Sequence, residues 1–215
     1  MSHGIYAALA AGVRSFESLD LVANNLANAD TPGYRAQRAV FKVVAPAEAA
    51  GATGAPARIA ERYLMLDEVS PDMRSGGLVR TEDPSNLALE GEGFFVIGSA
   101  EAPRYTRDGT LRVAADGQLV HQSGAPMLGE GGQPLQLQPG PFEVRPDGTV
   151  LQAGEEMGRI QVMRFDDPRA LSREGDNLFS AAGAQAVRAE DTVVTQGALE
   201  QSNVDPLREL VELIR

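Results

Sequence analysis

Apolar residues recur with strict four-three spacing near the start of the chain, and this repeat constrains the fold more than any other feature. The positions that carry it are Ile5, Leu9, Gly12, Phe16, Leu19, Ala23 and Leu26. Such spacing places the residues on one face of a helix, here called the N-terminal seam, and it is typical of helices that pack lengthwise on another helix. The helix should end near Asn28, because Asp30-Thr31-Pro32-Gly33 has the proline and glycine of a turn.

The end of the chain predicts a second amphipathic helix. Asp205 can cap it, and Pro206 suits its first position, where the missing N–H costs least. Four apolar residues then share one face at helical spacing: Leu207, Leu210, Val211 and Ile214. A helix of about ten residues is marginal in isolation and needs a partner. The simplest arrangement pairs the two terminal helices as a coiled coil, with both apolar faces buried together.

Between these helices the pattern changes to short runs of period two broken by glycine. Phe94–Ile97 is a continuous apolar run. Three Asp-Gly pairs, typical of tight hairpins, separate β-like runs: Asp108-Gly109, Asp116-Gly117 and Asp147-Gly148. The first two pairs predict a meander of strands at 104–107, 110–114 and 118–121. The predicted fold class is mainly β (α+β), with a central antiparallel β domain flanked by the terminal helices.

Composition changes mark the expected domain boundaries. Residues 45–57 are rich in alanine, glycine and proline and offer no periodic face, so they are either a flexible linker or a loop held in one orientation. We expect residues 1–44 to form the N-terminal helix and an extended segment, 58–194 the β domain, and 195–215 the C-terminal helix. The first and last segments together would make one helical domain.

Charge and cysteine content exclude several classes of protein. The chain has 30 acidic and 19 basic residues, a formal net charge of −11, which argues against nucleic-acid binding. It has no cysteine, so disulfides, thiolate metal sites and a cysteine nucleophile are excluded. No apolar run is long enough for a transmembrane helix. Arg14, Glu17 and Asp20 interrupt any secretory signal peptide.

Motifs for catalysis, metals or cofactors are not found. His3 and His121 are the two histidines, and neither has a second ligand at helix or strand spacing, so we expect each at the surface or in a turn. The glycines at 91–93 and 129–132 complete no phosphate-binding loop. Asp166-Asp167-Pro168 indicates a turn or a helix start. A carboxylate pair brought together by folding, as in a hydrolase, stays open at this point.

A stripe of asparagines lies beside the N-terminal seam. Leu21, Asn24, Asn25 and Asn28 share one helical face, although asparagine is a poor residue for a helix interior. Two interpretations stay open. The amides face neighbouring chains, or they form a solvated polar face at a frayed helix end.

Several longer motifs resemble those of the bacterial flagellar rod and hook axial proteins. The first is ANNLANADTPGYR at 23–35, and the second is QGALEQSNV at 196–204, before the C-terminal helix. Between them, LALEGEGFFV at 87–96, YTRDG at 105–109 and GAPMLG at 124–129 resemble the β-domain core. The resemblance covers nearly the whole chain in the family order. The opening MSHGIY and the short length are similar to the proximal-rod members, with the distal-rod members next.

This resemblance implies a structural protein with no cofactor or small-molecule substrate. It implies export through the flagellar type III apparatus without a cleaved signal. It also implies assembly in the periplasm, with copies of itself and other rod proteins, into a helical tube that transmits torque and surrounds the export channel. The paired helices would line this tube, and the β domain would form an outer layer. In the family the C-terminal helix usually runs several turns beyond the equivalent of Arg215, so the chain is either shortened or a short member.

The expected assembly interface combines the two helix faces, the asparagine stripe and the two terminal motifs. Its residues are Ile5, Leu9, Phe16, Leu19, Ala23, Asn24, Asn25, Leu26, Asn28, Thr31, Pro32, Gly33, Tyr34, Gln201, Ser202, Asn203, Val204, Leu207, Leu210, Val211 and Ile214. The neighbouring subunits would bury the apolar faces that a single chain leaves open. A secreted β-rich binding module is the alternative, and it would need no such burial.

Overall fold

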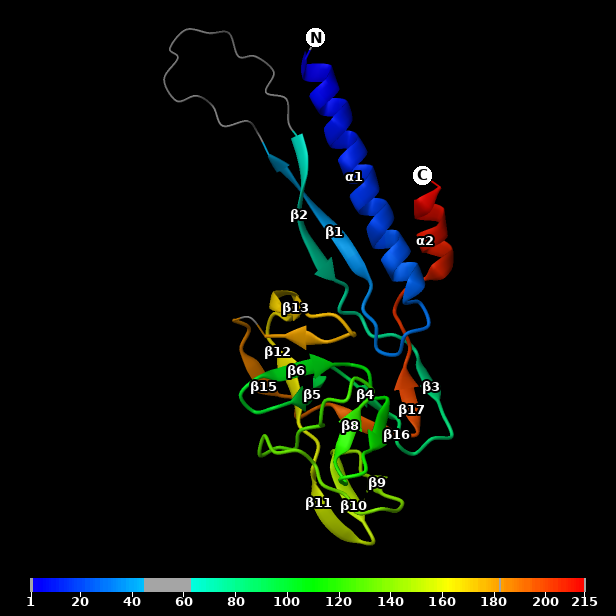
Figure 1. Ribbon diagram of the computed structural model, residues 1–215, viewed down its shortest axis with the longest axis vertical. Coiled ribbons are helices and arrows are strands. Elements are labelled where there is room, and N and C mark those ends of the chain that lie inside the picture. The colour runs from blue at the N-terminus through cyan, green and yellow to red at the C-terminus, as the bar shows by residue number, and fades with distance from the viewer. Residues whose placement is uncertain (1, 45–62, 182, 215) are drawn as a thin grey trace.

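The computed structural model describes residues 2–44, 63–181 and 183–214, with the side chains of 12–13, 15–39, 69–181 and 183–214 among them. The molecule is elongated (Figure 1). Two helices and a two-stranded ribbon extend from one end of a β domain, and both ends of the chain lie on that side. The chain is mainly β with one helix near each terminus, as its sequence predicts.

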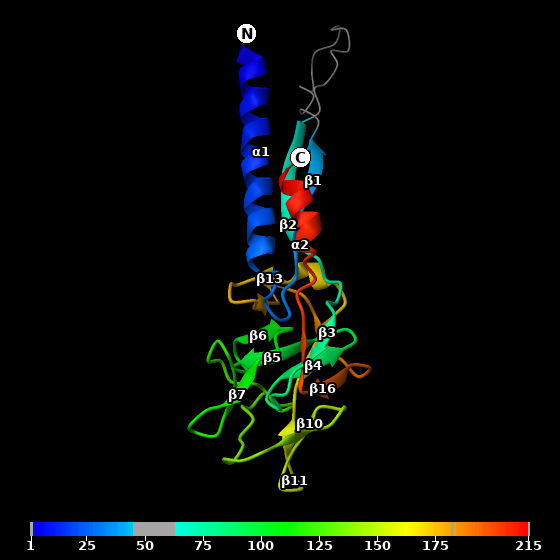
Figure 2. The same ribbon diagram turned by 90° about the vertical axis from the view of Figure 1, so that its right-hand side faces the viewer.

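The first helix, α1 (Ser2–Ala27), confirms the predicted N-terminal helix and its end. The predicted turn follows directly, and Asn28 N–H still donates to the carbonyl of Asn24 at 3.2 Å. The chain then enters β1 (Gln37–Val44), which pairs antiparallel with β2 (Tyr63–Pro71). The ribbon runs beside α1 in both views (Figure 2). The predicted linker at 45–57 lies outside the described residues.

The β domain is built from short antiparallel strands. A six-stranded sheet has the order β13-β14-β6-β5-β12-β15, and smaller sheets pair β16 with β4, β17 with β3, β7 with β8, and β10 with both β9 and β11. The strand bounds are β3 (Leu78–Arg80), β4 (Leu87–Glu90), β5 (Phe94–Gly98), β6 (Pro103–Thr106), β7 (Leu111–Val113), β8 (Leu119–His121), β9 (Glu143–Val144), β10 (Thr149–Gln152), β11 (Glu155–Arg159), β12 (Val162–Phe165), β13 (Ser172–Arg173), β14 (Phe179–Ser180), β15 (Ala186–Arg188), β16 (Val193–Gln196) and β17 (Ala198–Glu200).

Two hydrophobic clusters hold this domain together. The larger includes Phe95 and Leu119, both fully buried. The smaller stacks aromatic rings edge to face, with the centroids of Tyr105 and Phe165 4.7 Å apart and those of Phe94 and Phe179 5.8 Å apart. The apolar run Phe94–Ile97 lies in β5, where all four residues are buried.

The Asp-Gly pairs do not all make hairpins. Asp116-Gly117 turns between β7 and β8, and Asp147-Gly148 turns between β9 and β10, as predicted. The predicted meander is wrong at Asp108-Gly109, because β6 pairs with β5 and β14 instead of β7. The Asp108 carboxylate is fully buried and accepts from Thr110 N–H at 2.9 Å, so this pair closes an internal turn.

Short helical elements begin where capping residues predict. A 3-10 turn, η1 (Pro168–Ala170), starts at Asp167, whose side chain accepts from Arg169 N–H. The last helix, α2 (Pro206–Leu213), has Asp205 as its N-cap, with its carboxylate accepting from the N–H groups of Leu207 and Arg208. Both predicted helix starts are therefore confirmed.

Candidate assembly surface

The two terminal motifs meet at the junction between the helices and the β domain. Gly33 N–H donates to the Glu200 carbonyl at 2.7 Å, and Asn203 N–H donates to the Tyr34 carbonyl at 3.3 Å. These backbone bonds lay residues 33–36, at the end of the first motif and just beyond it, along residues 200–203 of the second. Segments more than 160 residues apart in the sequence thus form one structural unit.

Asn203 connects three segments of the chain through its side-chain amide. Its Oδ1 accepts from Ala36 N–H at 2.7 Å. Its Nδ2 donates to the carbonyls of Asp72 and Arg74, both at 2.7 Å. The amide therefore ties the first motif, the segment after β2 and the approach to α2 together. An aspartate in this position would lose both donations.

Asn25 performs a similar function between the two helices. Its Oδ1 accepts from Gln37 N–H at 2.7 Å, and its Nδ2 donates to the Gln37 carbonyl at 3.0 Å and to Glu209 Oε2 at 3.3 Å. Asn25 is 2% exposed and Glu209 is 3% exposed. Neither interpretation of the asparagine stripe describes Asn25, because its amide holds α1 to β1 and α2 within one chain.

Tyr34 anchors the turn of the first motif. Its hydroxyl donates to Asn24 Oδ1 at 2.8 Å, and the Arg173 guanidinium lies 4.2 Å from its ring centroid. Burial raises the pKa of this hydroxyl above its usual value, so it stays protonated and donates at neutral pH. Asn28 accepts from the Thr31 hydroxyl at 3.2 Å, which closes the turn before Pro32.

A buried ion triad lies beneath the junction. The Glu200 carboxylate accepts from Arg35 Nη2 at 2.7 Å, from Gly76 N–H at 2.9 Å and from Arg107 Nη1 at 3.2 Å. The side chains of the three charged residues are at most 4% exposed. Burial lowers the pKa of Arg107 to about 10, a larger effect than the opposing one of the Glu200 carboxylate. The triad links both motifs to the β domain.

Gly33 is required by backbone geometry at this point. Its φ is +65°, and a Cβ would lie 2.5 Å from the carbonyl carbon of Arg107 and the amide nitrogen of Asp108. The neighbouring Pro32 carbonyl accepts from Asn177 Nδ2 at 2.8 Å. The turn therefore packs its backbone directly on the backbone of the β domain.

The apolar faces of both helices are exposed. On α1 the N-terminal seam leaves Phe16 72% and Leu19 40% exposed, while Val22 beside it is 5% exposed. On α2 the predicted apolar face is open as well, with Leu207 at 76% and Ile214 at 84%. Ala23, Leu210 and Val211 are also exposed, and Leu26 is partly so. The side chains of Ile5 and Leu9 lie outside the described residues.

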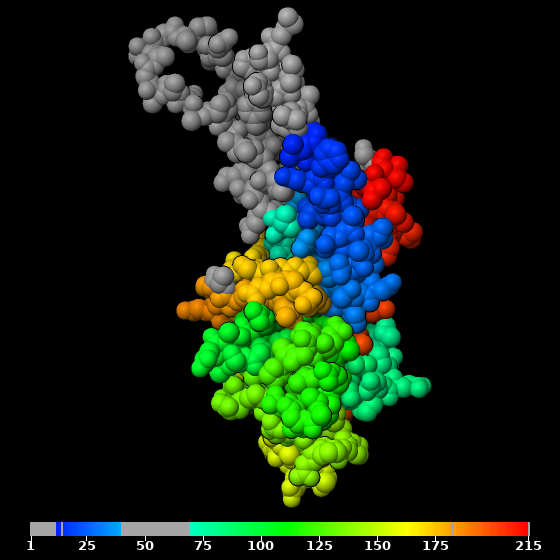
Figure 3. All heavy atoms as spheres, in the orientation of Figure 1, coloured from blue at the N-terminus to red at the C-terminus, as the bar shows by residue number. Residues whose placement is uncertain are grey.

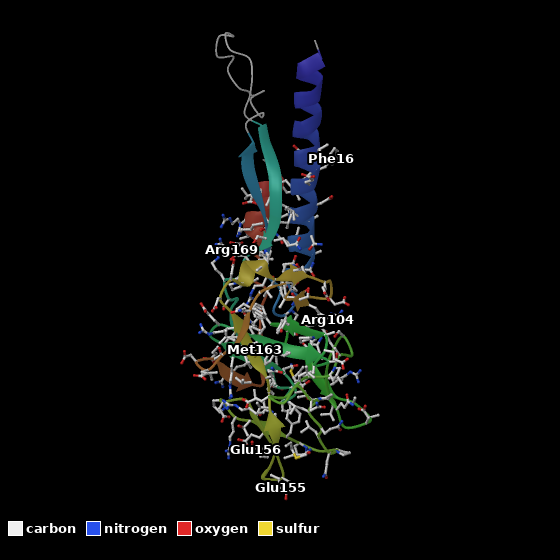
Figure 4. All side chains as sticks on the ribbon, turned by 90° about the vertical axis from the view of Figure 1, so that its left-hand side faces the viewer. Phe16, Arg104, Glu155, Glu156, Met163 and Arg169 are labelled. Atoms are coloured by element: carbon white, nitrogen blue, oxygen red, sulfur yellow. The ribbon has the colours of Figure 1, made fainter. Side chains whose placement is uncertain are left out.

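The two helices thus lie side by side without burying their apolar faces against each other, contrary to the predicted arrangement. The inward face of α2 carries Glu209, which meets Asn25, so the contact between helices is polar at this point. Figure 3 shows α1 and α2 at the surface of the molecule beside each other. Phe16, labelled on α1 in Figure 4, belongs to this open face.

The structure brings many of the residues predicted for the assembly interface together within one chain, at the junction, and adds several. Asn24, Asn25, Asn28, Thr31, Pro32, Gly33, Tyr34 and Asn203 share hydrogen bonds or contacts at the junction. Gln201 N–H and Val204, which is 9% exposed, also lie there, with Ser202 between them. Arg35, Arg107, Glu200 and Glu209 were missed. Arg35 and Glu200 lie inside the two terminal motifs, and this position was the signal in the sequence that could have identified them.

His121 differs from its prediction. It was expected at the surface or in a turn, yet its side chain is fully buried at the end of β8. Its Nε2 lies 3.2 Å from the Asp108 carboxylate, and its Nδ1 lies 2.9 Å from the Ser123 hydroxyl. The reason is the internal turn at Asp108, which places that carboxylate beside β8. Among the described residues there is no group of three acidic, histidine or cysteine side chains placed to hold a metal ion.

Comparisons with known proteins follow the same division of the chain. Residues 17–35 match the family described as flagella basal body rod protein, and residues 88–154 match the flagellar hook protein FlgE/F/G D1 domain. The chain is 34% identical to flagellar basal-body rod protein FlgF of Caulobacter vibrioides, over all of the chain and 87% of that relative. It is 32% identical to FlgF of Salmonella typhimurium over all of the chain and 88% of that relative. Identity to flagellar basal-body rod protein FlgG of Buchnera aphidicola is 29%, over 92% of the chain and 84% of that relative.

None of the described helices is long and apolar enough to cross a membrane.

Proposed function

The chain belongs to the family of flagellar basal-body rod proteins, and from this premise we propose that it is a subunit of the proximal rod that assembles through its terminal helices. Membership of this family agrees with the expectation of a structural protein and not an enzyme. The observation that carries the proposal is the pair of open apolar faces on α1 and α2. These faces have no cover from the described part of their own chain.

The energetics favour burial between subunits. A large apolar side chain gains about 1.5–3 kcal/mol on full burial. Phe16 and Leu19 on α1, with Leu207, Leu210 and Ile214 on α2, are each at least 40% exposed. Neighbouring subunits that cover these faces would supply several such increments per subunit. Coiled-coil packing of the two predicted faces therefore forms between chains in the assembled tube, with the junction described above setting the angle of the helices.

The junction also supports a role of the subunit in transmitting torque. Asn25, Asn203 and the Glu200 triad lock the helices to the β domain through buried polar contacts. A force applied to the outer β domain would therefore reach the helices through a rigid connection. In this proposal the helices line the tube around the export channel, the β domain forms an outer layer, and residues 45–57 remain a predicted linker.

The place of action follows from the same proposal. The relatives are named as basal-body rod proteins, which supports a location in the periplasmic rod. Membership of the same family supports export through the flagellar type III apparatus. Copies of itself and other rod proteins are the proposed partners.

A charge placed in the N-terminal seam tests the proposal. Leu19→Asp should abolish incorporation into basal bodies and motility, because a buried unpaired carboxylate costs more than the interface gains there. Ser18→Asp is the matched control, since Ser18 is exposed and lies off the seam. It should retain both properties. The β domain of each purified variant should unfold at the wild-type urea concentration. Normal motility of Leu19→Asp at wild-type abundance would refute assembly through this face.

A further inference from the structure

A groove of about 1100 Å³ lies at the waist of the molecule, between the base of the β1–β2 ribbon, η1 and the β domain. Seven arginines and three acidic residues line it, although the whole chain carries a net charge of −11. The groove thus concentrates more than a third of the 19 basic residues of the chain. The arginines come from five separate segments of the chain, so folding brings them together.

The floor of this groove holds unsatisfied donors. Arg35 and Arg107 belong to the buried triad, and both line the groove. Arg35 Nε and Nη1 and Arg107 Nε have no hydrogen-bond partner within the described part of the chain. Both side chains are at most 4% exposed, so they act on the groove through their charge and not by direct contact. The Glu200 carboxylate serves two guanidinium groups at once, so the floor keeps a positive excess.

The walls add accessible positive charge. Arg164 and Arg169 are exposed, and neither guanidinium has an ion-pair partner among the described residues. Arg38 and Arg74 share the single carboxylate of Asp72. Arginine is the side chain that best recognises carboxylates, because its planar donors match both oxygens. The groove therefore has the chemistry of a site for acidic side chains.

An acidic tip lies at the end of the β domain that is farthest from the helices. The β10–β11 hairpin turns at Ala153 and Gly154 and presents Glu155 and Glu156, both exposed and without an ion pair among the described residues. Figure 4 shows these two glutamates at the far end of the β domain, well away from Arg169 at the waist. The hairpin tip and the groove therefore do not meet within one molecule.

We propose that the Glu155–Glu156 hairpin tip of one copy docks into the arginine groove of a second copy. This contact joins two different surfaces, so it is heterologous, and repetition of a heterologous contact whose rotation does not close gives a helical assembly. The inference rests on the proposed self-assembly and adds to it a contact between β domains that is independent of the helix faces. Charge complementarity sets its register.

Site-directed crosslinking tests this contact, because the chain has no native cysteine. Ala153→Cys marks the hairpin tip and Ala170→Cys marks the groove beside Arg169, and both alanines are exposed. A strain that produces the double-cysteine chain is oxidised, and its basal bodies are isolated and separated without reductant. We expect oligomers joined tip to groove. The matched control replaces Ala170→Cys with Ala115→Cys, on an exposed turn away from the groove, and should give no such ladder.

Charge exchange then identifies the groove as the acceptor. Arg164→Glu with Arg169→Glu should reduce the crosslinked fraction at least tenfold, and adding Glu155→Arg with Glu156→Arg should restore it. If the double-cysteine chain is present in basal bodies and the cells swim, but crosslinking is no greater than in the Ala115→Cys control, the docking is overturned while the rod assignment stands. Crosslinking that persists after the arginine reversal would also overturn it. Absence of the wild-type chain from basal bodies would instead refute the proposed function.

Discussion

Removing the charge of Glu200 tests the buried triad on which the junction depends. Glu200→Gln keeps nearly the same shape, yet it leaves Arg35 and Arg107 buried without a counter-charge. It also places an amide donor opposite one of the two guanidinium groups, at a position where the carboxylate accepts a hydrogen bond. Breaking a buried ion pair by removing one partner costs about 3–5 kcal/mol. We expect a loss of that size in the free energy of unfolding, because all three side chains are at most 4% exposed.

Urea unfolding monitored by circular dichroism measures this loss. With a denaturant slope of about 2 kcal/mol per molar, the midpoint should fall by about 1.5–2.5 M. Glu156→Gln is the control, since Glu156 is exposed and its change should stay within about 0.5 kcal/mol. In an Arg107→Met background, Glu200→Gln should lower the free energy of unfolding by less, because only the Arg35 guanidinium is then left without a counter-charge. A midpoint for Glu200→Gln equal to that of the control would refute the energetic role of the triad.

Two further perturbations address the same junction. Hydrogen bonds, the largest from Arg74 and another from Arg38, hold the pKa of Asp72 well below its usual range. The Asp72 carboxylate therefore stabilises the folded chain above about pH 4, and this stabilisation is lost as the pH falls below that value. Asp72→Asn should therefore flatten the acid limb of stability against pH by about 1 kcal/mol or less, because Arg74 is largely solvent-exposed, and an unchanged acid limb would contradict this. Gly33→Ala should lower the melting temperature strongly, since its Cβ meets backbone atoms at 2.5 Å, whereas Gly124→Ala, with a similar φ and open space, should show only the smaller backbone strain of about 1 kcal/mol. Equal melting temperatures for the two variants would show that the close approach at Gly33 is tolerated.

Local signals predicted the elements well. The seam of α1, the Asp205-Pro206 start of α2 and the Phe94–Ile97 strand depend on neighbouring residues, so periodicity and capping rules find them. The hairpin turns at Asp116-Gly117 and Asp147-Gly148 were predictable for the same reason. The dipeptide Asp108-Gly109 has the same sequence as the two hairpin turns but forms an internal turn instead. The reason is that its partners, including His121, come from elsewhere in the chain, where a local rule cannot find them.

Long-range polar contacts were the part that sequence patterns did not provide. Asn25 was recognised as unusual in a helix, but its partners Gln37 and Glu209 come from separate elements. The pairing of Arg35 with Glu200 joins residues 165 positions apart. The orientation of the helices followed from these buried polar contacts. For that reason the apolar faces point outward, although pattern reasoning alone had paired them.

Hydrogen exchange of the terminal helices tests the central claim most directly, namely that their apolar faces are completed only between subunits. Amides of residues 2–27 and 207–213 would be compared in the dilute subunit and in isolated rods. Burial of two large apolar side chains gains about 3 kcal/mol, so we predict that the rod slows exchange in α1 by at least about a hundredfold. Equal, strong protection of both helices in the dilute subunit and in the rod would contradict the account.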